Sequence, residues 1–149
     1  MDVHRPETAA DGPSLILAAV DGTDTSMRAA AYAIGLARRG GAELVCLFVR
    51  DSGAIGMASP VAVTALRESN AATAVDLTAV AAERAATLGV PITVLDREGD
   101  PYRHILQAAR EYKADLVVLG ASTSRAHRLA GSLGVRLVKA RLCPVLVVP

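Results

Sequence analysis

The chain has 149 residues, of which 52% are hydrophobic but only 3% aromatic, and its formal net charge is +1. This length favours a single domain with one full core, and the hydrophobic content excludes a mainly disordered chain. A net charge so close to zero gives the whole molecule no reason to bind nucleic acid or an anionic membrane, so we expect neither partner.

The N-terminal segment and the two cysteines indicate the compartment. Residues 1–13 are polar and lack an apolar signal core, which predicts a disordered tail before a domain over 14–149. No apolar run approaches the roughly 20 residues needed to span a bilayer. Cys46 and Cys143 are too far apart for a metal motif, and their apolar surroundings predict buried free thiols. We therefore expect a cytoplasmic protein.

The first third of the chain predicts a strand, a helix and a second strand. Leu15–Val20 is a short apolar run, typical of a strand that is buried on both faces. Candidate N-caps at Thr23–Thr25 open a helix whose apolar residues follow helical spacing until Gly40. Leu44–Val49 is the second apolar run and the second predicted strand.

The middle of the chain predicts a loop followed by a long helix. Residues 51–60 are rich in Gly, Ala, Ser and Pro and show no periodicity, which is typical of a loop. A long Ala-rich helix is predicted from Val61 to Leu88, with Val80 and Ala81 on its apolar side.

The last third repeats the alternation of strand and helix. Asp100-Pro101 combines an N-cap residue with a proline at the first helical position. The predicted elements are a strand over Pro91–Leu95, a helix from Pro101, a strand over Leu116–Leu119, a helix over 132–141 and a strand over Val145–Val148.

This alternation predicts an α/β fold with a parallel sheet and right-handed crossovers. In such sheets ligands bind beyond the carboxyl ends of the strands, where the strand order reverses. Asp21, Val49 and Gly120 each stand at a predicted strand end, so we expect them around one crevice.

The segment after Gly120 has features of an anion site. A polar loop leads to Gly131-Ser132 at a helix start, where free backbone amides favour a phosphate or another anion. No acidic residue follows Asp115, whereas five basic residues do: Arg125, Arg128, Arg136, Lys139 and Arg141.

Six segments, in this order and spacing, resemble the universal stress protein family over about 15–149. They are Ile16–Gly22 with Ser26, Leu44–Val49, Gly99–Pro101 with Ile105, Ala114–Gly120, Gly131-Ser132 and Cys143–Pro149.

The resemblance implies a three-layer, open, twisted sheet of five parallel strands in the order 3-2-1-4-5, a Rossmann-like nucleotide-binding fold. It also implies a homodimer formed through the strand at 145–148. Many members bind ATP, accompanied where needed by Mg, through a motif G-x2-G-x9-G-S/T. Carried onto this chain, the resemblance assigns nucleotide contacts to Asp21, Val49, Gly120, Gly131, Ser132 and, by position, Leu133.

The chain departs from that motif. Thr123 stands where the second glycine belongs, and seven residues rather than nine separate it from Gly131. A β-branched residue does not readily adopt the positive φ that glycine allows. Either Ser122, Thr123 and Arg125 compensate with side-chain hydrogen bonds and charge, or the triphosphate pocket is lost.

Two functions therefore stay open. One is a stress-response module that binds an adenine nucleotide, with ATP as the default and cyclic AMP as an alternative. The other is an interaction protein that binds no nucleotide. We expect no enzyme beyond a slow ATPase, because neither Asp21 nor Asp100 has a recognisable catalytic partner in the sequence. His104 is assigned no role.

Overall fold

Five parallel strands form one sheet in the order β3-β2-β1-β4-β5, as predicted. The computed structural model describes residues 12–50, 76–121 and 132–149. The strands are β1 (Leu15–Val20), β2 (Glu43–Arg50), β3 (Ile92–Glu98), β4 (Leu116–Gly120) and β5 (Val145–Val148). The helices are α1 (Asp24–Gly40), a helix over 76–87, α3 (Pro101–Glu111) and α5 (Leu133–Lys139).

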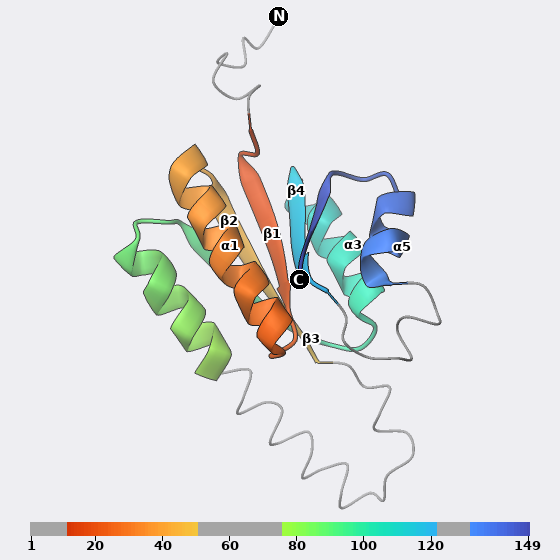
Figure 1. Ribbon diagram of the computed structural model, residues 1–149, viewed down its shortest axis with the longest axis horizontal. Helices are drawn as coiled ribbons and strands as arrows, with labels where there is room; N and C mark the ends of the chain where they lie inside the picture. Colours follow the sequence, from red (N-terminus) through yellow and green to blue (C-terminus); the bar gives the residue numbers. More distant parts are fainter. Residues whose placement is uncertain (1–11, 51–75, 122–131) are drawn as a thin grey trace, which may run out of the picture.

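Helices cover both faces of the sheet, which gives three layers (Figure 1). Ala29 and Ala33 of α1 and Ala85 of the helix over 76–87 pack against one face. Ile105 of α3 and Leu137 of α5 pack against the other. Small alanines on the first face allow helices to approach the sheet closely, which fits the low aromatic content.

Capping explains where the first helix begins and ends. Thr23 is the N-cap, and its side chain accepts a hydrogen bond from the backbone N–H of Ser26. Gly41 ends the helix in the left-handed region at φ 65°, a conformation that glycine adopts without a steric penalty. α3 begins at Pro101 as predicted, although the side chain of Asp100 makes no capping hydrogen bond.

The third strand is longer than predicted. β3 continues to Glu98, three residues beyond Leu95. Its polar end is held by β2, because Arg50 pairs with Asp96 and the Arg50 carbonyl accepts from the N–H of Gly99. The last helix is shorter than predicted and covers Leu133–Lys139.

The prediction for the helix over 76–87 was partly wrong. Val80 was placed on its apolar side but is 55% exposed, whereas Ala81 and Ala85 are buried. Residues four apart share a helix face, so Ala81 and Ala85 define the buried stripe and Val80 lies about 100° away from it. Residues 1–11 of the predicted tail over 1–13, the predicted loop over 51–60 and the predicted helical start over 61–75 lie outside the described residues.

Both cysteines are free thiols. Cys46 is buried, as predicted, whereas Cys143 is only partly buried. Burial raises the pKa of Cys46 to about 12. Burial and the Asp115 carboxylate raise the pKa of Cys143, against a backbone hydrogen bond with Val117 that lowers it. Within the part of the chain that the structure describes, no helix has the length and apolar character needed to cross a membrane.

Candidate ligand site at the carboxyl edge of the sheet

The register of the sheet brings three predicted site residues to one edge. Val20 of β1 pairs with Phe48 of β2, so Asp21 follows β1 beside Val49. Ala19 pairs with Leu119 of β4, which puts Gly120 at the same edge. β1 lies between β2 and β4, where the chain's strand order reverses. This is the position at which open α/β sheets bind ligands.

Asp21 shapes the turn from β1 into α1. Its Oδ1 accepts from the N–H of Thr23 at 3.0 Å and from the Thr23 hydroxyl at 2.6 Å. Its backbone N–H donates to the Ser26 hydroxyl at 3.3 Å, which in turn donates to the Thr23 carbonyl at 2.9 Å. Among the described residues no hydrogen bond uses Asp21 Oδ2, and the residue is exposed. One carboxylate oxygen therefore holds the turn and the other is available to a ligand.

Val49 does not end β2, and its side chain belongs to the core. It is 5% exposed and lies in the cluster that packs against α3. The strand ends one residue later, at Arg50. Any ligand contact at Val49 is thus left to its backbone.

Gly120 is required by packing between β4 and α1. A Cβ at this position would lie 2.5 Å from the backbone N of Ser26 and 2.5 Å from the carbonyl carbon of Thr25. These distances are far below van der Waals contact, so α1 can reach the end of β4 only because no side chain intervenes. The fold alone accounts for this glycine.

Ser132 caps the last helix. Its hydroxyl accepts from the N–H of Val135 at 3.2 Å, and Leu133 is the first helical residue. The first-turn amides of Leu133 and Gly134 precede the helix's internal hydrogen bonds, so they have no acceptor within the helix. The predicted site residues Ser122, Thr123, Arg125 and Gly131 lie outside the described residues.

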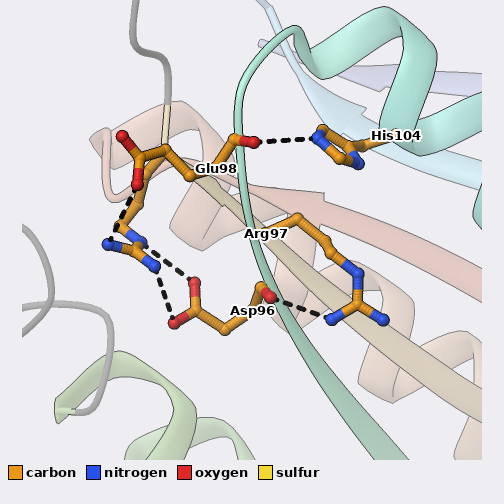
Figure 2. A network of polar contacts seen from close by, with 5 residues as sticks. Asp96, Arg97, Glu98 and His104 are labelled. Atoms are coloured by element: carbon orange, nitrogen blue, oxygen red, sulfur yellow. Dashed lines mark hydrogen bonds and ion pairs between the residues drawn. The ribbon is translucent and has the colours of Figure 1, made fainter.

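A polar network at the ends of β2 and β3 was not predicted from the sequence (Figure 2). Arg50 Nε lies 3.1 Å from Asp96 Oδ1, and Arg50 Nη1 lies 3.9 Å from Glu98 Oε2. His104 Nε2 lies 3.0 Å from the Glu98 carbonyl, so this histidine fastens the turn between β3 and α3. Asp96 and Glu98 are two residues apart, so the sequence does predict that they share a strand face. It does not predict that Arg50 on the neighbouring strand pairs with them.

The described residues do not form a metal centre by themselves. In residues 12–50, 76–121 and 132–149, no three His, Cys, Asp or Glu side chains group closely enough to hold a metal ion. The chemistry that this edge offers is hydrogen bonding: one exposed carboxylate oxygen at Asp21 and backbone donors at the start of α5.

A parallel sheet covered on both faces, with polar turns where its strand order reverses, defines an α/β protein with a Rossmann-like fold. The chain belongs to the universal stress protein family, since the model of that family matches residues 14–149. A universal stress protein of Methanocaldococcus jannaschii is 32% identical over 136 residues, which cover 89% of this chain and 80% of the relative.

Solved structures agree with this membership. Universal stress protein UspA from Lactobacillus plantarum is 29% identical with a TM-score of 0.77, and the match covers 91% of this chain and 97% of that chain. A universal stress protein solved in complex with cAMP has a TM-score of 0.70 at 24% identity, over 92% of this chain and 97% of that one. At this identity the second match supports the fold alone.

Proposed function

We propose that this chain is a cytosolic regulatory module that binds an adenine nucleotide, ATP first, at the carboxyl edge of its sheet. The observation that carries the proposal is the convergence of Asp21, Gly120 and the chain around Val49 where the strand order reverses. The fold is compatible with this ligand, since a universal stress protein with the same fold was solved in complex with cAMP.

The residues divide into a base side and a phosphate side. On the base side, the free Oδ2 of Asp21 accepts from the adenine amino group, and Val49 contributes through its backbone. On the phosphate side, Ser132 and the first-turn amide of Leu133 donate to phosphate oxygens, because amides at a helix start favour anions. Gly120 keeps the chain close to α1 between the two sides. The loop residues that the sequence analysis predicted as ligand contacts provide further donors on this side: Ser122, Thr123, Arg125 and Gly131.

These contacts are sufficient for moderate affinity. Hydrogen bonds to charged groups contribute about 1.5–3 kcal/mol each. Micromolar binding requires about 8 kcal/mol. Four or five such bonds reach that value after the free-energy cost of ordering the site is subtracted. A magnesium ion would enter with ATP and be held mainly by its phosphates, because the described residues hold no three-ligand group.

The test is calorimetric titration of nucleotide-free, folded protein with ATP, ADP, AMP and cyclic AMP. We expect saturable binding that Ser132→Ala weakens and Ser132→Thr, which keeps the hydroxyl, preserves. Because the alanine also removes a helix cap worth about 1 kcal/mol, folding of each variant is checked by circular dichroism. Thr87→Ala is the matched control, since the Thr87 hydroxyl bonds Glu83 within a remote helix. Heat-silent titrations of the wild type with all four nucleotides would refute the proposal.

No described group supports rapid hydrolysis, so we propose a binding role in place of an enzymatic one. Oδ1 of Asp21, the carboxylate nearest the crevice, is held by Thr23, and the proposed site assigns Oδ2 to the adenine amino group, so this carboxylate has no oxygen left to activate water. A slow ATPase is the most that this arrangement supports. Turnover at ordinary enzymatic rates that Asp21→Ala abolishes, with ATP binding retained, would contradict the binding role.

We further propose a homodimer formed through β5. In the described residues this strand pairs only with β4, which leaves an edge with unpaired backbone groups. Apolar side chains lie exposed on and near it: Val135 at 49%, Val138 at 58%, Leu142 at 38% and Val147 at 44%. The same apolar edge favours the second candidate function, a module that acts through protein contacts without nucleotide.

A further inference from the structure

The outer side of α3 forms a shallow groove between two arginines. The groove has a volume of about 620 Å³, and the described residues that line it all belong to this helix: Arg103, Leu106, Gln107, Arg110 and Glu111. Leu106 is half-buried, whereas the other four residues are exposed. Residues three or four apart share a helix side, so this side carries an arginine toward each end and an apolar side chain between them.

The described part of the chain does not neutralise these two arginines. Within residues 12–50, 76–121 and 132–149, the side chain of neither Arg103 nor Arg110 makes an ion pair or a hydrogen bond. Arg103 also stands in the first turn of α3, where the helix dipole disfavours a cation, so the helix itself gains nothing from it. Seven helical residues span about 10 Å, which is the axial separation of the two cations.

Arg136 of α5 adds a third cation beside this groove. Its guanidinium carbon lies 4.0 Å from the centroid of the Tyr102 ring, which is the geometry of a cation–π contact. Tyr102 and Leu106 are one helical turn apart, so the stacked guanidinium lies next to the apolar part of the groove. Stacking occupies one face of the guanidinium and leaves its N–H edge available to a carboxylate.

The charge of the protein is distributed unevenly between its two helical layers. The helices α3 and α5, which share one face of the sheet, carry four Lys and Arg residues against one Glu (Figure 1). The helices of the other layer, α1 and the helix over 76–87, carry four Arg residues against three acidic ones. The layer with the groove is therefore the more cationic one, although the whole chain is nearly neutral.

We propose that the outer side of α3 docks an acidic amphipathic helix of a partner protein. Arg103 and Arg110 each pair with a carboxylate of that helix, and Leu106 contacts an apolar residue between the two acids. Carboxylates seven residues apart match the arginines, because both helices rise about 1.5 Å per residue. α3 packs against β1 and β2, whereas β5 lies at the far edge of the sheet, so this docking depends neither on the β5 dimer nor on a bound nucleotide.

Other anionic partners fit this side of α3 less well. Tight binding to a nucleic acid backbone takes about six to ten phosphate contacts, and single strands also stack on exposed aromatic rings. Here three cations are present, and the ring of Tyr102 is already covered by Arg136. Attachment to an anionic membrane takes about four to eight clustered cations. Three cations around one leucine are instead suited to a short protein segment.

The experiment measures binding of the full chain to a labelled synthetic helix of about 18 residues by fluorescence anisotropy. The peptide carries two Glu residues seven positions apart with a Leu between them. The variant is Arg103→Glu/Arg110→Glu, and the matched control is Arg38→Glu/Arg39→Glu, an exposed pair on α1 with the same change in charge. We expect the control to bind within about twofold of wild type and Arg103→Glu/Arg110→Glu to bind at least about tenfold more weakly.

A second peptide, with Lys in place of both Glu residues, tests the charge pairing directly. Arg103→Glu/Arg110→Glu should bind this peptide more tightly than wild type does, which is the reverse of the order for the Glu peptide. Circular dichroism checks that each variant is folded. Should Arg103→Glu/Arg110→Glu not fold, wild type alone decides, since it should bind the Glu peptide at least about tenfold more tightly than the Lys peptide.

Four results would overturn the inference. Equal weakening in the variant and in the α1 control would mean that only overall charge matters. Wild type that binds the Glu peptide no better than the Lys peptide would remove the charge complementarity. Absence of Glu-peptide binding to wild type at about 1 mM would remove the docking itself. Tighter binding of an oligouridine RNA or of phosphatidylserine vesicles than of the Glu peptide would identify another class of partner.

Discussion

Replacement of Gly120 by alanine tests whether this glycine serves the fold. The added Cβ would lie 2.5 Å from Ser26 N, 2.5 Å from the Thr25 carbonyl carbon and 2.7 Å from the Thr25 carbonyl oxygen. All three are backbone atoms, so no side chain can rotate away. Relief requires the first turn of α1 to move about 1 Å away from β4 to restore ordinary contact distances.

The magnitude follows from the two effects of that movement. Overpacking a close contact costs about 1–3 kcal/mol. The displacement also stretches the bond from Thr25 to Ala121, and loss of such a bond costs about 0.5–1.5 kcal/mol. We therefore expect Gly120→Ala to lower the free energy of unfolding by about 2–4 kcal/mol, which is a large part of the stability of a small domain.

The assay is urea unfolding followed by circular dichroism, beside Gly35→Ala as the matched control. Gly35 lies inside α1, and the nearest atom to its added Cβ is the flexible end of Arg39 at 3.8 Å. Because alanine is more favourable than glycine in a helix interior, Gly35→Ala should raise the free energy of unfolding by about 0.5–1 kcal/mol. A Gly120→Ala variant as stable as wild type would refute the packing account. The expected loss also means that weakened nucleotide binding in this variant is no proof of ligand contact.

Four further predictions concern the opposite edge, the two thiols and the dimer. Asp115 Oδ2 accepts hydrogen bonds from Ser14 N, Ser14 Oγ and Leu15 N at 2.9, 2.6 and 3.0 Å. Asp115→Ala should therefore lower the free energy of unfolding, measured in urea, by about 1–3 kcal/mol. An unchanged unfolding midpoint would contradict this. At pH 8 a thiol reagent should label Cys143 slowly and Cys46 only on unfolding, because burial raises the pKa of both; rapid labelling of folded Cys143→Ser would be inconsistent with that. The pKa of Cys46 is about 12 in the folded protein, above its ordinary value of 9.0. The protonated thiol therefore contributes fully to stability below pH 9, and this contribution is lost as the pH rises from 9 toward 12. The decline in unfolding free energy over this range should be smaller in Cys46→Ala. Val147→Lys should convert a dimer into monomers in light scattering, whereas Tyr32→Lys, at an exposed apolar residue on α1, should not. A wild-type monomer at micromolar concentration would remove the dimer proposal.

The sequence predicted the sheet because its central strands are continuous apolar runs. Leu15–Val20 is nearly all buried, and such a run has few other stable placements. The end of β3 was missed because Asp96, Arg97 and Glu98 look like loop residues in isolation. Only the pairing with Arg50, on a strand distant in sequence, explains their extended conformation.

The candidate site was less predictable than the fold. Position at a strand end predicted that Asp21 and Gly120 lie at one edge of the sheet, since the carboxyl ends of parallel strands share one edge. The physical reason for Gly120 depends on how close α1 approaches β4, which no local pattern contains. The hydrogen bond from the Thr25 hydroxyl to the Ala121 carbonyl was not predicted for the same reason, because the two residues lie 96 positions apart in the sequence.

The most direct test of nucleotide binding at this edge is an amide chemical-shift map of the isotopically labelled protein titrated with ATP. Nucleotide binding at this edge should give saturable shifts concentrated at Asp21, Gly120 and Ser132. Shifts at Ser14 and Asp115, on the opposite edge of the sheet, should be small. Saturable shifts confined to that opposite edge, or no shifts at all in folded nucleotide-free protein, would contradict the proposed site.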